Sequence, residues 1–462
     1  MITLIEHGWV VPVDGKQAHI EDGAVAFEDG RIVGVGPTAE IAAKFRADGS
    51  QVKRIDARGK AVLPGFINTH IHLIGGLNKG LTEDVPKNAA GVSGGLFKIA
   101  MPLHYVYAQA PEVYWLASMH ALECVRTGTT TVNEMGKFER EVARVVRDVG
   151  LRAVMAENIR DSAVVDVRPG VVERTFVPSD AERCIEDALA FIEEWHGKAD
   201  GRITCRFGPN APDTCAESTL VRVKELADKH GFGLHTHLAQ VPGEREYVVK
   251  AQGRSPVKYL ADLGYLNPSL VAAHCVFMSE EDAEMFAASG AHMSHTAYLV
   301  GKRGYFPPMK TLYANKASVA LGSDWLSNDM FKIMRSAILL ARQQAASVAV
   351  VDGPRALEMA TMGGARALGM ERDIGSLEAG KKADLILLDM DTPWVNPIRP
   401  AQLVSNIVYN ANGSDITHVW IDGREVVTDR KVVTIDGAEA RRECQATAER
   451  VWSRASSLFA GT

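Results

Sequence analysis

The pattern of apolar and polar positions at the two ends of the chain is that of short β-strands. In residues 1–62, runs of β-branched residues are broken by turn pairs, and Asp29-Gly30 in "GAVAFEDGRIVGVG" separates two alternating segments as in a β-hairpin. A similar pattern returns near the other end, where Asp422-Gly423 in "HVWIDGREVV" predicts another hairpin. We therefore expect the two ends to build one small β-sandwich together.

The middle of the chain alternates between short apolar runs and helix-like stretches such as "DAERCIEDALAFIEEW" and "ESTLVRVKELADKHG". Repeated alternation of strand and helix predicts a parallel sheet. Eight strands are the number that closes a (β/α)8 barrel. The eight apolar runs are "GFINTHIHL", "GTTTVNEMG", "LRAVMAENI", "ITCRFGPNAP", "FGLHTHLAQ", "LVAAHCVFM", "GAHMSHTAY" and "ASVALGSDW".

These patterns predict an α/β protein in which a (β/α)8 TIM-like barrel carries a smaller β-sandwich domain formed by both chain ends. The expected boundaries are residues 1–63 for the first part of the sandwich, 64–372 for the barrel and 373–462 for the second part of the sandwich. The last part ends in a predicted helix from Gly437 to Leu458.

Composition and charge narrow the choice of partners. The formal net charge is −6, and hydrophobic and charged residues make up 46% and 23% of the chain, so there is no electrostatic reason to expect nucleic-acid binding. No apolar run reaches the length of a membrane span, the N-terminus has no export signal, and the six cysteines lack metal-binding or disulfide spacing. We expect a cytoplasmic homo-oligomer that binds a small-molecule substrate, and neither nucleic acid nor a membrane.

Histidines and one aspartate stand where the predicted barrel strands end. His70 and His72 are two residues apart, so their side chains share one face of a strand and can meet one ion, although such a pair alone can equally be two hydrogen-bonded histidines. The other residues of this kind are His235 and His237 on strand five, His274 at the end of strand six and Asp324 at the end of strand eight. Because catalytic groups of such barrels lie at the carboxyl ends of the strands, these residues predict a catalytic site for Zn²⁺ or Fe²⁺.

A metal ion explains these residue types. It lowers the pKa of a bound water to about 7, and a neighbouring carboxylate, for which we choose Asp324, can take and return the proton. We expect His274 to hydrogen-bond the nucleophile or the developing oxyanion without binding the metal. The remaining histidines are expected to support a ligand (His235), to form either site wall or packing (His292 and His295), or to lie on the surface or in packing (His104, His120 and His196).

The chain also resembles a known family. "PGFINTHIHL", "ECVRTGTTTV", "LHTHLA", "AAHCVFMSEED", "VALGSDW" and "IGSLEAGKKADLILLD" occur in the order found in the amidohydrolase superfamily, in the branch of methylthioadenosine/S-adenosylhomocysteine deaminases, guanine-like deaminases and atrazine chlorohydrolases. The resemblance implies the same barrel and sandwich, and one divalent metal, Zn²⁺ before Fe²⁺, held by His70, His72, His237 and Asp324, with His274 facing the substrate. The strand-four run has no lysine that could bridge two metals.

Three positions depart from the family pattern. Gln240 stands where deaminases carry a glutamate that shuttles a proton to a ring nitrogen, and a glutamine cannot do this. Asn210, in "GPNAPDT", stands in the place of a substrate-contacting histidine, and "SHTAYLV" lacks the Ser-Asn of the motif after strand seven. These departures weaken the expectation of a nucleoside deaminase, and we expect Gln240 to orient the substrate.

The sequence therefore predicts a metal-dependent hydrolase that cleaves a non-peptide carbon–nitrogen bond of a small organic molecule, with Asp324, His274 and Gln240 as catalytic residues. Cleavage of an amide, urea or carbamate ranks first, because Asp324 alone can serve there as base and as acid. The alternatives are deamination or dechlorination of an N-heterocycle such as a purine or triazine, and, in another class, a non-catalytic binding protein on the same barrel.

Overall fold

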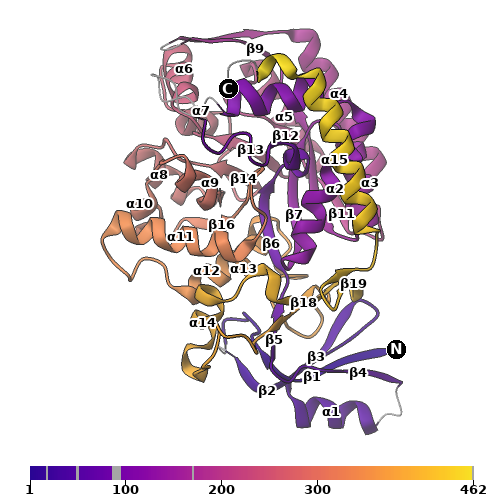
Figure 1. Cartoon of the computed structure of the whole chain (residues 1–462). Helices are drawn as coiled ribbons and strands as arrows, with labels where there is room; N and C mark the ends of the chain where they lie inside the picture. Colours follow the sequence, from indigo (N-terminus) through magenta and orange to yellow (C-terminus); the bar gives the residue numbers. More distant parts are fainter. Residues whose placement is uncertain (17–18, 48–50, 86–94, 169–170, 460–462) are drawn as a thin grey trace.

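The larger part of the molecule is a barrel of parallel strands (Figure 1). The structure is a computed structural model, and it describes residues 1–16, 19–47, 51–85, 95–168 and 171–459. Each apolar run that predicts a barrel strand forms one, and the fourth run forms two short pieces in succession. The strands are β6 (Phe66–Ile71), β7 (Thr129–Gly136), β8 (Arg152–Ile159), β11 (Ile203–Cys205) with β12 (Gly208–Pro209), β13 (Leu234–Leu238), β14 (Leu270–His274), β15 (His292–His295) and β16 (Ser318–Leu321).

The barrel closes through short backbone contacts at two seams. β6, β7, β8 and β11 pair in one parallel group, and β13 to β16 pair in another. Phe207 pairs with Leu234 at the first seam, and Ile71 pairs with Asp324 at the second, where the Asp324 amide donates to the His70 carbonyl oxygen at 2.9 Å. The prediction of a (β/α)8 barrel is therefore confirmed, and the second seam joins two strands that carry predicted site residues.

Amphipathic helices cover the outside of the barrel and bury their apolar faces against it (Figure 1). In α3, Val142, Val145, Val146 and Val149 follow the spacing of one helix face and are buried, whereas the arginines between them are exposed. The outer helices are α2 (Ala110–Arg126), α3 (Glu139–Val149), α4 (Pro178–Trp195), α5 (Glu217–His230), α6 (Pro242–Gln252), α7 (Pro256–Asp262), α8 (Glu280–Ala288), α9 (Ala297–Lys302), α10 (Met309–Ala314), α11 (Met330–Ala345), α12 (Gly353–Met359) and α13 (Met362–Ala367).

Both chain ends contribute to one nine-stranded sheet below the barrel (Figure 1). β5 and β17, from opposite ends of the chain, are antiparallel neighbours at its centre. Helix α1 (Thr38–Ala47) packs on this sheet, and α14 (Leu403–Asn410) lies between β17 and β18 in the chain. The strands are β1 (Ile2–Val10), β2 (Ile20–Glu28), β3 (Arg31–Pro37), β4 (Val52–Asp56), β5 (Lys60–Pro64), β17 (Leu385–Asp389), β18 (Ile416–Ile421), β19 (Arg424–Thr428) and β20 (Lys431–Val432).

The sheet folds over itself and encloses a second apolar core. The rings of Phe27 on β2 and Trp420 on β18 have centroids 6.1 Å apart, although three strands separate β2 from β18 in the sheet order. Because neighbouring strands lie about 4.8 Å apart, a flat sheet would hold these rings much further from each other. The two ends of the chain therefore form one small domain in the manner of a β-sandwich.

Some elements are not predicted from the sequence. After β6 the chain forms a 3-10 turn, η1 (Leu73–Asn78), and two π-helical turns, η2 (Gly95–Ala100) and η3 (Leu103–Tyr107), and after β8 it forms a hairpin of β9 (Ser162–Arg168) and β10 (Val171–Phe176).

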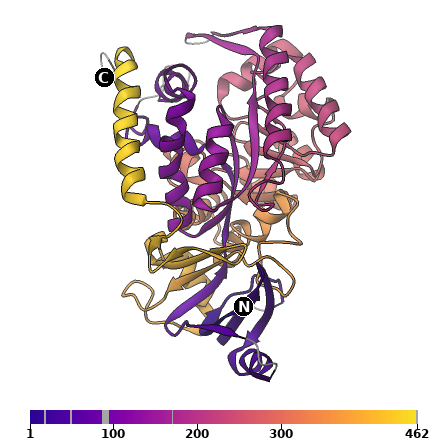
Figure 2. The ribbon, with the colours of Figure 1, turned by 90° about the vertical axis from the view of Figure 1, so that its right-hand side faces the viewer.

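Helix α15 (Gly437–Arg454), the predicted terminal helix, leaves the small domain and packs along α2 of the barrel (Figure 2). Among the described residues, no helix has the length and apolar character needed to cross a membrane.

Candidate active site

The carboxyl ends of three strands carry residues in the left-handed region of backbone space. Ala239, just after β13, has a φ of 49°, His274, the last residue of β14, has a φ of 78°, and Asp324, shortly after β16, has a φ of 62°. Residues other than glycine adopt such values at a cost on the order of 1–3 kcal/mol each, and these residues concentrate at functional sites. The turns end the strands abruptly and leave His274 and Asp324 at the rim of the barrel.

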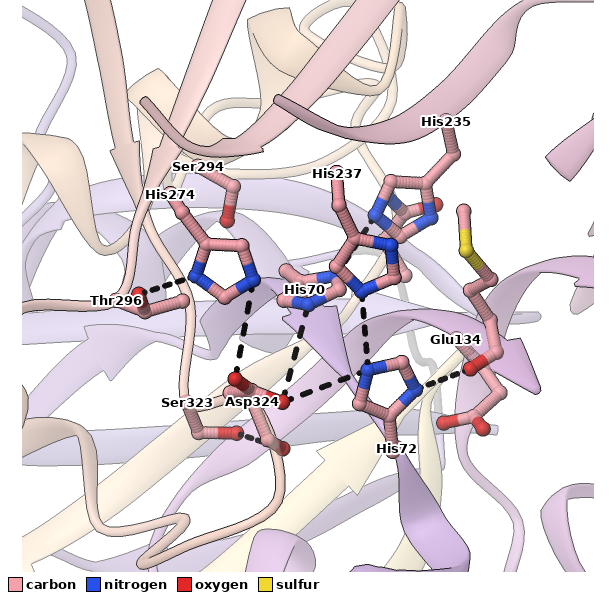
Figure 3. A network of polar contacts seen from close by, with 12 residues as sticks. His70, His72, Glu134, His235, His237, His274, Ser294, Thr296, Ser323 and Asp324 are labelled. Atoms are coloured by element: carbon pink, nitrogen blue, oxygen red, sulfur yellow. Dashed lines mark hydrogen bonds and ion pairs between the residues drawn. The ribbon is translucent and has the colours of Figure 1, made fainter. Parts of the chain in front are cut away.

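Four histidines and Asp324 converge at this rim (Figure 3). One ligand atom from each of His70, His72 and His237 lies within 4.8 Å of the others, and His70, His274 and Asp324 form a second group of the same kind. Nε2 of His72 is 3.3 Å from Nε2 of His237 and 3.4 Å from Oδ1 of Asp324, and Nε2 of His70 is 3.9 Å from the same oxygen. All five side chains are buried. The fold thus brings together all four residues that were expected to hold a metal.

In three of these histidines, Nδ1 contacts a group outside the cluster. Nδ1 of His72 and Nδ1 of His237 contact backbone carbonyl oxygens, at 2.7 Å for His237, and Nδ1 of His70 is 2.9 Å from Nε2 of His235. A ring nitrogen that faces a carbonyl oxygen carries the proton, so His72 and His237 present the lone pair of Nε2 to the cluster. His235 contacts the ring nitrogen of His70 that is not the one facing Asp324, so it lies on the outer side of His70. Figure 3 shows both rings near His237.

His274 faces the carboxylate of Asp324 from another side. Its Nε2 is 3.8 Å from Oδ2 of Asp324, and its Nδ1 is 2.9 Å from Oγ1 of Thr296. The imidazole ring lies parallel to that of His237, with centroids 5.4 Å apart and an interplanar angle of 14°. His274 therefore lies beside the cluster of His70, His72 and His237, and its Nε2 faces the carboxylate of Asp324.

Buried polar atoms without a hydrogen-bond partner gather in this cluster. Within the described residues they include Nε2 of His70, Nε2 of His274 and both carboxylate oxygens of Asp324. Burial lowers the pKa of His70 well below its usual value and that of His237 to about 3, so both rings are neutral at physiological pH, and burial raises the pKa of Asp324. Neutral imidazoles with a carboxylate are a donor set that Zn²⁺ and Fe²⁺ accept, so the residues present fit one divalent metal.

A pocket that is partly open to solvent reaches the cluster. His72 and His237 form its inner end, and Gln240, the third predicted catalytic residue, lies in its wall. The other lining residues are Leu96, Met101, His104, Tyr105, Arg160, Arg174, Asn210, Ala211, Asp213, Thr214, Val241, Glu244 and Trp325. A small organic molecule in this pocket would meet both the cluster and Gln240.

The other histidines lie in different places. His292 begins β15 at the opposite end of the barrel and contacts the Ser318 hydroxyl at 2.7 Å, so it belongs to packing. His295 ends β15 and is buried, but it does not line the pocket. His104 differs from its expected surface or packing role, because it lies in the pocket wall with its ring centroid 6.0 Å from that of Trp325.

Several polar pocket residues were not found from the sequence. Arg174 lies on β10 of the unpredicted hairpin and forms an ion pair with Asp213. Arg160 follows β8, and no periodicity marks it as a site residue. Glu244 lies in the first turn of α6, soon after Gln240 in the sequence. This closeness to a predicted site residue is the one sequence signal that could have pointed to it.

The sequence profile of the amidohydrolase family matches residues 61–426, which span the whole barrel and, in the small domain, β17, β18 and parts of β5 and β19. The chain belongs to the amidohydrolase family. Residues 23–47 of this amidohydrolase also match a bacterial imidazolonepropionase-like composite domain.

This amidohydrolase has relatives along its full length. It is 35% identical to 5-methylthioadenosine/S-adenosylhomocysteine deaminase of Moorella thermoacetica over 94% of this chain and 96% of the relative. It is 32% identical to 5'-deoxyadenosine deaminase of Methanosarcina mazei over 98% and 99% of the two chains. An adenosine deaminase from Xanthomonas campestris, solved with bound zinc, is similar with a TM-score of 0.87 and 28% identity over 98% of each chain. Atrazine chlorohydrolase of Arthrobacter aurescens TC1, with a TM-score of 0.83 and 22% identity over 96% and 100% of the chains, shares the fold.

The family relationship makes this protein an enzyme, a hydrolase that acts on a carbon–nitrogen bond of a small molecule. The non-catalytic alternative is thereby set aside. The relatives favour deamination over the amide, urea or carbamate cleavage that ranks first from the sequence alone. That ranking depended on the three departures from the family pattern, above all on Gln240, and assumed that no other side chain could supply a second acid.

Proposed function

We propose that this amidohydrolase is a metal-dependent aminohydrolase that releases ammonia from an aminated N-heterocycle, a purine derivative before a triazine. The observation that carries the proposal is the convergence of His70, His72, His237 and Asp324 beside a pocket that His72 and His237 line. Nε2 of His70 and both carboxylate oxygens of Asp324 are buried there without a hydrogen-bond partner among the described residues. Full-length relatives at 32% and 35% identity that are deaminases support this choice of reaction.

His70, His72, His237 and Asp324 are the residues that would hold one divalent cation, with Zn²⁺ first and Fe²⁺ second. Three imidazoles and a single carboxylate suit either ion, and the zinc of the Xanthomonas campestris deaminase favours Zn²⁺. When bound, the cation supplies the nucleophile, because it lowers the pKa of a water molecule to about 7.

Asp324 transfers the proton of the attacking water, and His274 hydrogen-bonds the oxygen of that water. Asp324 accepts the proton that the attacking water loses and returns it to the departing amine. In the tautomer of His274 with the proton on Nε2, the Thr296 hydroxyl donates to Nδ1, and Nε2 can donate to the oxygen of the attacking water and orient it toward the ring carbon. Both side chains are buried, so water competes little for these hydrogen bonds.

Gln240 and Asn210 position groups rather than transfer protons. Gln240 offers an amide donor and acceptor to a substrate in the pocket. Asn210 is already engaged, because its side-chain oxygen accepts from the Thr214 hydroxyl at 2.8 Å and its backbone oxygen lies 2.7 Å from Nδ1 of His237. Asn210 therefore holds a metal-ligand candidate in place.

A substrate panel tests the proposal. Zinc-loaded protein would be incubated with 5'-deoxyadenosine, 5'-methylthioadenosine, guanine, an aminotriazine, and open-chain amides and ureas, and ammonia and ring products would be quantified. We expect ammonia from at least one aminated ring. The Asp324→Asn variant should stay folded and lose kcat by about 100-fold to 10,000-fold, because the proton transfer is lost. Turnover of amides or ureas without deamination of any ring compound would refute the proposal.

A further inference from the structure

Hydrolytic deamination of a ring needs an acid besides Asp324. When water adds to the ring carbon that bears the amino group, the electron pair of the C=N bond moves to the adjacent ring nitrogen, and a proton must arrive there. Gln240 lies in the pocket wall, but a carboxamide has no proton to give at neutral pH. A different side chain of the pocket has to supply that proton.

Most titratable side chains of the pocket wall cannot act as this acid. Arg160 and Arg174 are permanent cations. Asp213 forms an ion pair with Arg174, so its carboxylate is already engaged by a cation. Burial raises the pKa of Tyr105 to about 12 and lowers the pKa of His104 to about 3, so the first holds its proton too tightly and the second carries none to spare.

Glu244 lies in the pocket wall next to Gln240. It belongs to the first turn of α6 and is 1% exposed. Its Oε2 accepts a hydrogen bond from the backbone N–H of Gln240 at 2.6 Å, and its Oε1 accepts one from the backbone N–H of Ala239 at 2.6 Å. The carboxyl group therefore sits against the backbone of the two residues that follow β13, and Glu244 and Gln240 both line this corner of the pocket.

The surroundings of Glu244 favour its protonated form. Burial, and then the negative charge of Asp213, raise the pKa of Glu244 to about 8, against the opposing effects of the two amide donors and of Arg174. A carboxyl group with such a pKa holds its proton at neutral pH and can still release it, which suits a general acid.

Resting on the proposed function, we infer that Glu244 gives its proton to the ring nitrogen beside the amino-bearing carbon, in place of an acid at position 240. The water oxygen bonds to that carbon, one water proton goes to Asp324, and the C=N electron pair moves to the ring nitrogen, which takes the Glu244 proton. The bond to the amino group then breaks, and ammonia leaves with the proton from Asp324. The hydroxyl proton returns to Glu244 as the C=O bond forms, so one water is consumed and both carboxyl groups are restored.

The inference predicts a specific pH profile. Ammonia release from 5'-deoxyadenosine would be measured from pH 6 to pH 10 for the wild type, Glu244→Gln, Gln240→Glu and the double variant, with zinc content and thermal unfolding as controls. The wild-type kcat/KM should fall as pH rises through about 8, because Glu244 must be protonated. Glu244→Gln should lower kcat/KM at pH 7 by at least about 100-fold and abolish this alkaline decline. Adding Gln240→Glu should restore part of the loss, because it places an acid at the same corner.

An infrared measurement separates this inference from the proposed function. The difference spectrum between the wild type and Glu244→Gln at pH 7 should contain the carbonyl band of a protonated carboxylic acid, and 5'-deoxyadenosine should shift that band. If the wild type deaminates no compound but the band is present and shifts, the proposed reaction fails and Glu244 remains an acid that faces the ligand. A missing band, an alkaline decline that persists in Glu244→Gln, or a folded double variant without any rescue overturns the inference.

Discussion

Two clusters of buried polar side chains lie at opposite ends of the barrel, and they differ in how their polar atoms are satisfied. At the base, Arg152, the first residue of β8, donates to Asp384 at 2.7 Å and 2.9 Å and lies 3.3 Å from Asp422. At the rim, Nε2 of His70 and both carboxylate oxygens of Asp324 have no hydrogen-bond partner within the described part of the chain. Arg152, Asp384, His70 and Asp324 are almost completely shielded from solvent, and Asp422 is 15% exposed.

The difference separates stability from function. The base cluster joins the barrel to two residues of the small domain, so its bidentate ion pair holds the two parts together. Buried polar atoms that lack partners cost folding free energy, and a chain tolerates them where a ligand supplies the partner. Substitutions at the base should therefore change stability, and substitutions at the rim should change metal binding and turnover.

The largest effect should follow removal of a rim histidine. His237→Ala deletes a ring nitrogen from the group formed with His70 and His72, and we expect it to abolish both bound metal and activity while the protein stays folded. Metal content per chain, measured after dialysis, checks this expectation. His292→Ala, a buried histidine at the base end of β15, is the matched control and should retain the metal. Full metal content in His237→Ala would disprove the assignment of this ligand.

A smaller effect, on stability alone, should follow at the base. Asp384→Ala leaves the buried guanidinium of Arg152 without its bidentate partner, which should lower the free energy of unfolding by about 3–5 kcal/mol. Chemical denaturation measures this change, and metal content and kcat should stay at wild-type values. The control is Asp429→Ala, which removes a carboxylate that is 85% exposed and should have little effect. Equal destabilisation by both variants would show that the base cluster does not join the two parts of the molecule.

The two regions also differ in how well the sequence predicts them. All eight apolar runs form barrel strands, because strand length and alternation with helices are written in local patterns. The rim follows from the barrel, since parallel strands of a closed barrel bring their carboxyl ends together even when His70 and His235 are 165 residues apart. One rule of strand geometry therefore predicts a cluster built from distant parts of the chain.

The pocket wall beyond the strand ends could not be predicted in this way. Arg174 reaches the pocket on a hairpin inserted after β8, and no periodic pattern fixes the path of such an insertion. The same lack of information about the loops explains why amide cleavage ranked above deamination in the sequence analysis. That ranking considered Gln240 without the side chains that the loops bring beside it. Glu244 is close to Gln240 in the sequence, but its contact with the Gln240 backbone and its place in the pocket wall are seen only in three dimensions.

The smallest effect should come from a residue that supports the rim without belonging to it. His235 lies 2.9 Å from Nδ1 of His70, and its ring meets that of His70 edge to face with centroids 5.0 Å apart. His235→Phe keeps a ring of similar shape but removes the hydrogen bond, so Nδ1 of His70 loses its partner. Loss of such a supporting contact lowers metal affinity by about 10-fold to 100-fold, and competition with a chelator of known affinity can measure this change. His295→Phe makes the same substitution at a buried histidine outside the pocket and should leave the affinity unchanged. If the two variants bind zinc equally well, the orientation of His70 is fixed by the strand β6 backbone and not by His235.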